Sequence, residues 1–250
     1  MELIEALRML AADLGVRQSF PTAAFSADDD PGKPNNALID LALQAARCAA
    51  ETDLSDLSRR LNGPPYWPEI WPGEHYKLLT GLVQVLTPRV VVEIGTATGL
   101  SALAIKKNLL PTSRVVTFDV IPWTEFPGRV LTPADFSDGR LQQFVDDLAS
   151  PSVARRHASL LNEADFVFID AAKDGQLELA LLYNLATVGL REGTLLMFDD
   201  IRMLTMLPMW RQIALPKLDL TSFGHWSGTG LVLWFGSIPW MAPNLKQQGG

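Results

Sequence analysis

The chain has 250 residues, of which 48% are hydrophobic and 20% are charged, so it has ample material for a buried core. Its 21 Lys and Arg residues face 28 Asp and Glu residues, and the resulting net charge of −7 lacks the basic excess of a nucleic-acid-binding protein. The single cysteine, Cys48, excludes a disulfide scaffold, and its helix-like surroundings indicate a small buried hydrophobe.

The first residues do not have the pattern of a signal peptide, because acids at Glu2 and Glu5 stand where a basic region would precede an apolar core. No run of about 18 apolar residues follows, so we expect no membrane-spanning helix. We therefore expect a cytoplasmic protein that binds neither nucleic acid nor a membrane.

Residues 1–73 are predicted to form helices separated by breakers. Leucines at helical spacing indicate the first helix, and prolines mark the breakers. The expected order is a helix from Leu3 to Leu14, a polar loop from Ser26 to Asn36, helices from about Asn36 to Ala50 and from about Thr52 to Leu61, and a proline-rich stretch from Asn62 to Gly73 without regular structure.

From Glu74 onward, a helix to Leu86 precedes short apolar runs that alternate with helical segments. Such alternation predicts an α/β fold with a doubly wound, mostly parallel, Rossmann-like sheet. The last two runs have no helix between them and predict an antiparallel edge pair. The expected strands are Arg89–Ile94, Arg114–Asp119, Leu141–Val145, Asp165–Asp170, Thr194–Asp199, Leu218–Ser222 and Gly230–Phe235, with helices near Leu100–Asn108, Gln176–Gly189 and Met203–Ala214. We therefore divide the chain into an N-terminal helical appendage, residues 1–73, and a second domain, residues 74–250.

Acidic residues stand at the ends of the first five predicted strands. In a parallel sheet, ligands bind outside the carboxyl ends of the strands, where these acids would gather along one edge. Helix capping explains one such acid but not five in register. The acids are Glu93, Asp119, the pair Asp146 and Asp147, Asp170, and the pair Asp199 and Asp200.

Two glycines, Gly95 and Gly99, bracket a tight turn between the first strand and the following helix. Glycine permits a close backbone approach to a ligand, and the helix N-terminus offers free N–H groups. The sequence Gly-Thr-Ala-Thr-Gly differs from the dinucleotide fingerprint G-x-G-x-x-G. Asp119 ends the next strand about 20 residues later, where an acid can accept hydrogen bonds from ribose hydroxyls. This spacing favours a ligand that contains a nucleoside.

Three ordered motifs carry a resemblance to a known family. VVEIGTATGLSALAI resembles motif I of the class I S-adenosylmethionine-dependent methyltransferases. ADFVFIDAAKDG and LLMFDDIR resemble the fourth- and fifth-strand motifs of the metal-dependent O-methyltransferases of the catechol and caffeoyl-CoA type. The resemblance extends from about Glu74 to Phe235 and implies a seven-stranded sheet. Residues 1–73 carry no such motif.

The resemblance also implies the residues that bind the cofactor S-adenosylmethionine. Glu93 and Gly95 would lie beside its methionine part, together with Thr96, Gly99 and Ser101 of the same turn. Asp119 would hold the ribose. Asp147 would approach the adenine, with its neighbour Asp146 as the alternative. The segment Ile121–Asp138 is longer than the usual connection and is expected to contribute to a lid over the cofactor or the substrate.

In the resembled family, the positions of Asp170, Asp199 and Asp200 bind a divalent cation. Three converging carboxylates would repel one another without a cation, and Mg²⁺ takes oxygen ligands. The pair Asp-Asp departs from the Asp-Asn of the catechol enzymes and resembles the metal-dependent sugar O-methyltransferases of macrolide and aminocoumarin pathways, which puts a catechol substrate in doubt. Capping of the next helix is the alternative role of Asp200.

Lys173 follows Asp170 by three residues and matches the lysine that serves as the base in the catechol-type enzymes. A base beside a metal-bound hydroxyl can remove its proton. Asp170 and Lys173 are therefore the expected catalytic residues, and Asp174 is a rival base. His75 and His157 show no metal-ligand spacing, and His225 is expected to be structural or to orient a substrate hydroxyl. Aromatic residues such as Trp67 and Trp226 either line a pocket or pack the appendage onto the sheet.

These observations predict an O-methyltransferase that uses S-adenosylmethionine and a divalent cation to methylate a hydroxyl of a small molecule, in a chain that forms a homodimer. One alternative is a methyltransferase-fold protein that binds the cofactor without metal-dependent activity. Another is a nicotinamide-dependent oxidoreductase. The Gly-Thr-Ala-Thr-Gly turn and the set of three carboxylates are both evidence against this alternative.

Overall fold

The computed structural model describes residues 32–236. The helix expected from Leu3 to Leu14, and most of the loop expected from Ser26 onward, lie outside these residues. Within the described range, no helix has both the length and the apolar character needed to cross a membrane.

A single seven-stranded sheet forms the centre of the molecule, with the strand order β3-β2-β1-β4-β5-β7-β6. Strands β1 to β5 pair in parallel, and β7 runs antiparallel to both β5 and β6. This arrangement confirms the predicted mostly parallel sheet with an antiparallel edge pair. The strands are β1 (Val90–Ile94), β2 (Arg114–Asp119), β3 (Leu141–Val145), β4 (Phe166–Ile169), β5 (Leu195–Asp199), β6 (Lys217–Asp219) and β7 (Thr229–Leu233).

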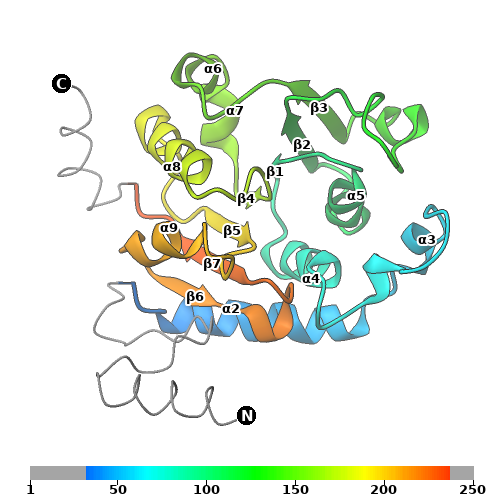
Figure 1. Ribbon diagram of the computed structural model, residues 1–250, viewed down its shortest axis with the longest axis horizontal. Coiled ribbons are helices and arrows are strands. Elements are labelled where there is room, and N and C mark those ends of the chain that lie inside the picture. Colours follow the sequence, from blue (N-terminus) through cyan, green and yellow to red (C-terminus); the bar gives the residue numbers. More distant parts are fainter. Residues whose placement is uncertain (1–31, 237–250) are drawn as a thin grey trace, which may run out of the picture.

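Helices cover both faces of this sheet (Figure 1). Helices α2, α4 and α5 lie on one face, and α6, α7, α8 and α9 lie on the other. Every residue of β1, β4 and β5 is buried, as the near-continuous apolar composition of these strands requires. The helices are α2 (Asn36–Glu51), α4 (Tyr76–Leu86), α5 (Leu100–Lys107), α6 (Pro151–Arg156), α7 (Ala158–Glu163), α8 (Gln176–Val188) and α9 (Leu207–Gln212).

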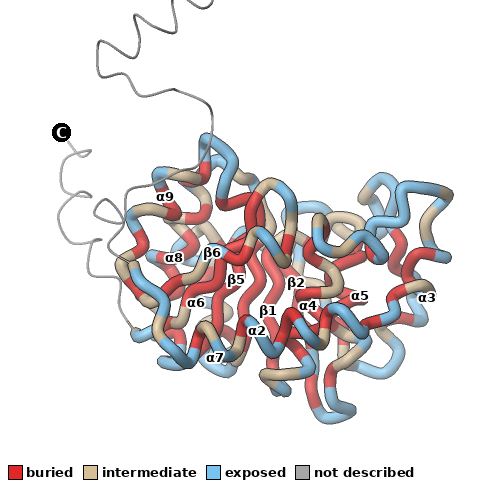
Figure 2. The backbone as a smooth tube through the Cα atoms, turned by 90° about the horizontal axis from the view of Figure 1, so that it is seen from below, coloured by how far each residue is buried: buried red, intermediate tan, exposed pale blue. Residues whose placement is uncertain are grey.

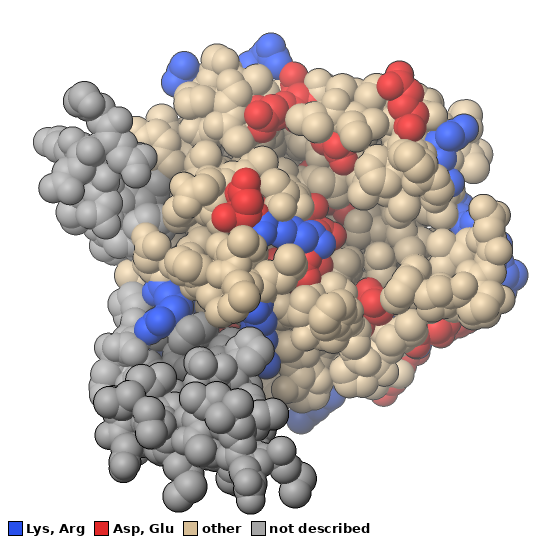
Figure 3. Space-filling view, viewed as in Figure 1, with Lys and Arg blue, Asp and Glu red and all other residues tan. Residues whose placement is uncertain are grey.

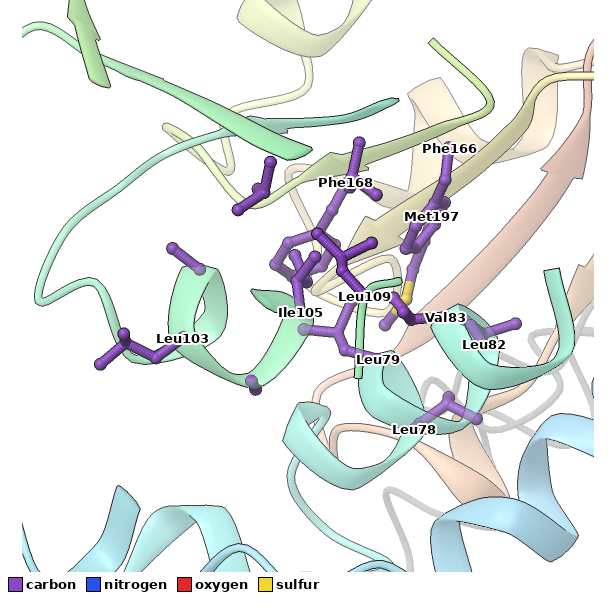
Figure 4. Packing of buried hydrophobic residues seen from close by; sticks show 14 of the residues in the cluster. Leu78, Leu79, Leu82, Val83, Leu103, Ile105, Leu109, Phe166, Phe168 and Met197 are labelled. Atoms are coloured by element: carbon purple, nitrogen blue, oxygen red, sulfur yellow. The ribbon is translucent and has the colours of Figure 1, made fainter. Parts of the chain in front are cut away.

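The core on the α4 side joins helices to the middle of the sheet. Leu79 and Val83 of α4 and Ile105 of α5 pack near Phe168 of β4 and Met197 of β5 (Figure 4). In Figure 2 the strands form a buried band, and the exposed segments lie at the periphery. Burial of one such large apolar side chain contributes about 1.5–3 kcal/mol, so this packing holds α4 firmly against β4 and β5.

Helix α2 belongs to this same layer, although it precedes the sheet in sequence. Its N-cap is Asn35, whose side chain accepts a hydrogen bond from Leu38 N at 2.8 Å. The helix crosses α4 so closely at Gly81 that an added Cβ would collide with the carbonyl oxygen of Ala45. The described part of the N-terminal region therefore packs directly on α4, in the helix layer that covers this face of the sheet.

Several predicted elements differ from those observed. The expected helix from Met203 begins only at Leu207, because Pro208 favours the first helical turn and Met203 to Met206 form turns instead. The expected strand from Leu218 to Ser222 ends at Asp219 and gives way to a 3₁₀ turn. Helices α6 and α7 were not predicted. They are six residues each, too short to show a clear hydrophobic period.

The remaining short elements lie in the connections. The helix expected from Thr52 to Leu61 is a single turn, and the proline-rich stretch, where no regular element was expected, contains one 3₁₀ turn. These elements are α3 (Ser55–Ser58), η1 (Trp67–Glu69), η2 (Pro133–Phe136) and η3 (Thr221–Phe223). Because β1 has β2 on one side and β4 on the other, the connections from β1 and β4 diverge to opposite faces and leave a crevice at their carboxyl ends.

Candidate active site

A cavity of about 320 Å³ opens at the carboxyl ends of β1, β2 and β4. Gly95 and Ala97 of the glycine turn, Asp119 at the end of β2, and Asp170 after β4 all contribute to its lining. Asp146 and Asp147, which follow β3, line it as well. The structure thus brings five of the strand-end positions singled out in the sequence to one cavity.

The glycine turn is built around a close contact with the strand next to it. Gly95 has a φ of 103°, and an added Cβ would collide with the carbonyl oxygen of Asp170. Glycine is therefore required here by both backbone conformation and space. Gly99 has a φ of 83° and lies against the side chain of Leu131, which any larger residue at this position would have to displace.

The carboxylate of Asp119 organises the same turn. Its Oδ2 accepts a hydrogen bond from Ala97 N at 2.9 Å, and its Oδ1 accepts one from Ile121 N at 3.0 Å. Ala97 has a φ of 43°, a left-handed conformation that costs a non-glycine residue about 1 kcal/mol or more. Asp119 therefore holds a strained turn in place at the edge of the cavity.

Three of the predicted cofactor residues lie behind the turn, outside the cavity lining. Thr96 is buried, and its hydroxyl lies 2.7 Å from the Thr117 hydroxyl. Gln143 Nε2 donates a hydrogen bond to the same Thr96 oxygen at 3.0 Å. Ser101 is buried in the first turn of α5, and Gly99 is the N-cap of that helix.

Glu93 is also behind the turn and is fully buried near the carboxyl end of β1. Neither of its carboxylate oxygens has a hydrogen-bond partner of suitable geometry. Burial raises the pKa of this carboxyl to about 7, against the opposing influence of the Ser101 and Thr117 hydroxyls. Glu93 thus titrates near neutral pH rather than at the acidic pH of an exposed glutamate.

The two acids after β3 differ in their partners. Asp146 forms an ion pair with Arg156 and lies 2.7 Å from His157 Nε2. Asp147 is more exposed, and its Oδ1 accepts a hydrogen bond from Ala149 N at 2.8 Å. The carboxylate of Asp146 is thus engaged by a cation, whereas that of Asp147 faces the cavity mouth with a neutral backbone partner.

A cluster of three carboxylates lies beside the cavity, at the ends of β4 and β5. One oxygen each of Asp170, Asp199 and Asp200 lies within 4.8 Å of the others. Asp199 is 2% exposed, and both of its carboxylate oxygens are buried without a hydrogen-bond partner. Acidic and basic side chains also meet near the centre of the face shown in Figure 3. Such oxygen donors match the ligands of a hard divalent cation.

The ammonium group of Lys173 lies among these three carboxylates. It is 3.1 Å from Asp170 Oδ1 and 3.9 Å from Asp199 Oδ2, and it forms a close ion pair with Asp200. Burial lowers the pKa of Lys173, but the three carboxylates outweigh this effect and hold the pKa above its usual range. In this arrangement Lys173 is protonated and neutralises part of the cluster.

The cluster also determines the pKa of its acids. Burial and the neighbouring Asp199 raise the pKa of Asp170. Burial alone would also raise the pKa of Asp200. Hydrogen bonds from His225, Lys173 and Ser227 outweigh this effect and hold its pKa well below the usual range. Asp200 does not cap the next helix, because α9 begins only at Leu207. The position of Asp200 is therefore that of a member of the carboxylate cluster and not that of a helix cap.

The loop that carries Lys173 is braced from two sides. Glu178 is fully buried and accepts hydrogen bonds from Lys173 N at 2.9 Å and Gly175 N at 2.8 Å. The Thr205 hydroxyl donates to the Lys173 carbonyl at 2.6 Å. Asp174, the rival base, is exposed and accepts hydrogen bonds from the first backbone amides of α8, so its carboxylate serves as a helix cap.

His75, which showed no metal spacing in the sequence, meets His225 at this cluster. His75 Nδ1 lies 3.5 Å from Asp199 Oδ2, and His225 Nδ1 lies 3.4 Å from the same oxygen. The two rings are 5.6 Å apart between centroids. Burial lowers the pKa of His75, but Asp199 outweighs it and raises the pKa to about 9. No local spacing could have predicted this pair, because its members lie in loops that are far apart in sequence.

Backbone hydrogen bonds join the segment before α4 to the loop between β6 and β7. Gly73 N donates to Gly224 O at 3.0 Å, and Trp226 N donates to Gly73 O at 2.9 Å. Trp71 Nε1 donates to Phe223 O at 2.7 Å. Trp71 therefore packs the N-terminal region onto the connection between β6 and β7, whereas the neighbouring Trp226 is 74% exposed.

The long segment after β2 forms part of the cavity wall. Val120 and Phe126 line the cavity directly. The rings of Trp123 and Phe136 stack with their centroids 5.2 Å apart, which folds the segment back on itself. Arg60 makes a two-pronged ion pair with Asp135, at 2.8 and 2.9 Å, and so ties the segment to the N-terminal region.

Comparisons with known proteins agree with this description. Residues 92–201 match a family described as a methyltransferase domain. This match includes the glycine turn, the lysine loop and all three clustered carboxylates, and it excludes both histidines. No curated protein sequence matches the chain.

Solved structures with a similar fold are distant in sequence. The O-methyltransferase from Bacillus cereus in complex with SAH is 20% identical over 80% of this chain and 92% of its own, with a TM-score of 0.47. The SAH-bound methyltransferase PaMTH1 from Podospora anserina is 16% identical over 78% of this chain and 88% of its own, with a TM-score of 0.48. A methyltransferase from Geobacter sulfurreducens is 19% identical over 64% of this chain and 78% of its own, with a TM-score of 0.47.

Proposed function

We propose that the chain, whose residues 92–201 match a methyltransferase domain family, transfers the methyl group of S-adenosylmethionine to a hydroxyl of a small molecule. The position of Asp170 carries this proposal. This residue lines the cavity beside Gly95 and also belongs to the carboxylate cluster with Asp199. A methyl donor in the cavity and a hydroxyl held at the cluster would therefore meet at Asp170.

The cavity supplies the groups that a nucleoside sulfonium needs. We propose that Asp119 accepts hydrogen bonds from the ribose hydroxyls and that Asp147 lies beside the adenine. Gly95 permits the methionine part to approach the backbone. Glu93, Thr96, Gly99 and Ser101 then act from behind, by holding the turn in shape. The transfer itself is an in-line displacement, which needs positioning and charge placement more than covalent chemistry.

We propose that Asp170, Asp199 and Asp200 hold a divalent cation, most simply Mg²⁺. The residues fit this role because both oxygens of Asp199 are buried without a partner and because the cluster consists of oxygen donors only. When bound, the cation would lower the pKa of a hydroxyl placed beside it.

The proton of the acceptor hydroxyl needs a base, and we propose Lys173 Nζ, which contacts all three carboxylates. The role requires the pKa of Lys173 to fall from its raised value, because a protonated ammonium cannot accept a proton. Its backbone is held by Glu178 and Thr205, so the side chain stays directed at the cluster. Asp174 is the weaker candidate because it caps α8.

The acceptor is proposed to enter from the side formed by residues 67–73 of the N-terminal appendage and the loop between β6 and β7. The exposed rings of Trp67 and Trp226 offer apolar surface on these two segments. Segment Ile121–Asp138 is proposed to cover the donor. We also propose that the chain forms a homodimer, as expected from the sequence.

Calorimetric titration of Mg²⁺ into the full chain saturated with S-adenosylhomocysteine tests the proposal. We expect heat with about one-site stoichiometry in the wild type, its loss in Asp199→Ala, and its retention in Glu192→Gln, which changes an exposed acid remote from the cluster. Formation of S-adenosylhomocysteine from S-adenosylmethionine is then followed with a panel of hydroxylated compounds, with and without EDTA.

Each outcome decides between functions. Metal heat together with EDTA-sensitive turnover supports the O-methyltransferase. Cofactor binding without a metal response overturns the metal-dependent reaction and leaves a protein that binds the cofactor alone. Binding of NAD in preference to S-adenosylhomocysteine overturns the methyltransferase reaction itself.

A further inference from the structure

Three side chains next to the carboxylate cluster form a separate set of potential metal ligands. They are His75, Asp199 and His225, and one donor atom of each lies within 4.8 Å of the others. We propose that these residues bind a second cation, of the transition-metal class, at a position that shares Asp199 with the Mg²⁺ site. The inference rests on the proposed function only through this shared carboxylate.

The distances in this set are those between ligands of one ion rather than those of hydrogen bonds. His75 Nδ1 and His225 Nδ1 lie 3.5 and 3.4 Å from Asp199 Oδ2. Two ligands at about 2.1 Å from a tetrahedral ion are about 3.4 Å apart, whereas hydrogen-bonded nitrogen and oxygen atoms are about 2.7–3.2 Å apart. Both nitrogens therefore lie from Asp199 Oδ2 at the separation expected between two ligands of one ion.

Burial without partners independently indicates a ligand. His75 is 4% exposed and Asp199 is 2% exposed. Both ring nitrogens of His75 and both carboxylate oxygens of Asp199 are buried and have no hydrogen-bond partner. A buried polar group that lacks a partner costs about 1–3 kcal/mol, so four such atoms at one place require compensation. A cation between Nδ1 and Oδ2 would satisfy two of them.

The surroundings of the two rings orient them toward Asp199. The ring of His75 packs against Tyr76 and Phe168, with centroids 4.3 and 5.2 Å away. Glu74 Oε2 lies 3.6 Å from His225 Nε2, on the side of the ring away from Asp199. A carboxylate behind a ligating histidine fixes its tautomer and orientation in many metal sites.

His225 Nδ1 has other neighbours, which metal binding would have to replace. It lies 3.2 Å from Asp200 Oδ1 and 2.5 Å from the Ser227 hydroxyl. The Ser227 hydroxyl also donates to Asp200, and Lys173 pairs with the other oxygen of Asp200. Asp200 therefore keeps two partners when His225 Nδ1 turns to an ion, and binding exchanges a hydrogen bond for a coordination bond.

The donor types decide which class of cation fits. Neutral imidazole nitrogen binds Zn²⁺, Fe²⁺, Co²⁺ and related ions, whereas Mg²⁺ prefers oxygen and keeps several waters. Two histidines and one carboxylate leave further positions on the ion open to water or to substrate oxygen. The chain would then hold two neighbouring cations of different chemistry around Asp199.

Cobalt absorption tests this site without any measurement of activity. The full chain is freed of metal with a chelator, and Co²⁺ is added while the visible spectrum is followed. Nitrogen-ligated Co²⁺ of low coordination number absorbs strongly in the visible, and hexa-aqua or all-oxygen Co²⁺ absorbs weakly. We expect a strong band at one equivalent, which excess Mg²⁺ does not remove.

Variants assign the band to its ligands. His75→Gln and His225→Gln should each abolish it or weaken Co²⁺ binding at least 10-fold. Asp170→Asn, which removes a ligand of the carboxylate site alone, and His157→Gln, which removes a histidine outside the set, should retain it. Circular dichroism and thermal unfolding show whether each variant is folded, and His225→Gln replaces His75→Gln if the latter is not.

The proposal is overturned if the wild type gives no strong band, or if a folded His75→Gln and a folded His225→Gln both retain it. Loss of the band in Asp170→Asn also overturns it, because the ion would then sit among the carboxylates. The Mg²⁺ heat measured with S-adenosylhomocysteine stands apart from these results. Its absence beside an intact cobalt band would contradict the proposed reaction and leave the histidine site standing.

Discussion

Lys173 and Asp200 both adopt left-handed backbone conformations, with φ values of 62° and 59°, and their side chains form an ion pair across two loops. Such a conformation costs a non-glycine residue about 1 kcal/mol or more and persists only where surrounding contacts enforce it. Here Glu178 and Thr205 hold the Lys173 backbone, and His225 and Ser227 hold the Asp200 side chain. The strain is concentrated where two strand ends bring charge together.

Replacing Lys173 with methionine should make the chain depend more strongly on Mg²⁺. The ammonium partly neutralises three carboxylates, so its loss should reduce the free energy of unfolding in EDTA by about 1–2 kcal/mol, a value discounted for the partly exposed side chain. Added Mg²⁺ should then raise the melting temperature of Lys173→Met more than that of the wild type. Lys107→Met, which removes a surface ion pair with Asp56, is the control. If Mg²⁺ raises the melting temperatures of Lys173→Met and the wild type equally, the ammonium does not have this role.

Asp119→Ala should weaken binding of S-adenosylhomocysteine by about 1–3 kcal/mol, because it removes a charged acceptor and releases the turn at Ala97. Asp119→Asn keeps one acceptor oxygen and should lose less. Calorimetric dissociation constants for the three proteins check this order. If Asp119→Ala binds as tightly as the wild type, Asp119 has no part in the ribose site.

Glu93→Gln should remove a pH dependence of stability. In the unfolded chain Glu93 loses its proton near its ordinary pKa of 4.5, whereas in the folded chain it keeps the proton up to about pH 7. The raised pKa means that the folded state becomes less stable relative to the unfolded state as pH rises from about 4.5 to about 7. One pKa unit corresponds to about 1.4 kcal/mol. The free energy of unfolding of the wild type should therefore fall by about 3 kcal/mol over this pH range, and that of Glu93→Gln should not show this fall.

Chemical denaturation in EDTA at pH 5 and pH 8 measures this difference for wild type and Glu93→Gln. Other titrating groups act equally on both proteins and cancel in the comparison. Glu192→Gln, a change of an exposed acid, should follow the wild type at both pH values. Parallel pH profiles for wild type and Glu93→Gln would show that Glu93 is not held protonated by burial.

Gln143→Leu should weaken cofactor binding although Gln143 lies outside the cavity lining. Its Nε2 donates to Thr96 Oγ1 at 3.0 Å and to Ile121 O at 3.2 Å, and its Oε1 accepts from Trp123 N at 2.8 Å. It thus joins the glycine turn to the segment after β2. Loss of these bonds should raise the dissociation constant of S-adenosylhomocysteine about 5- to 30-fold, at about 1 kcal/mol per bond with partial compensation by water.

The neighbouring Gln142→Leu is the matched control, since Gln142 is exposed and points to the opposite face of β3. Limited proteolysis provides a second readout, because a loosened segment between β2 and β3 should be cut faster in Gln143→Leu. An unchanged dissociation constant together with an unchanged cleavage rate would remove Gln143 from this role.

The apolar runs of the chain were enough to predict the strands of the parallel sheet and its antiparallel edge. A strand buried on both faces must be apolar throughout, so its composition marks it without reference to distant residues. The three carboxylates could be predicted as a group for a related reason. Parallel strands end at a common edge, so Asp170 and Asp199 are brought together by topology alone.

Only the tertiary structure decided what surrounds these carboxylates. Lys173 was expected to act as a base, yet Asp170, Asp200 and Asp199 together raise its pKa, and two of these three carboxylates lie at the end of another strand. His75 and His225 meet at Asp199 because backbone hydrogen bonds from Gly73 join two loops that are far apart in sequence. Local pattern carries the information for strands and turns, since these depend on neighbouring residues. The charge of a site depends on which loops the packed core brings together, and no short stretch of sequence records that.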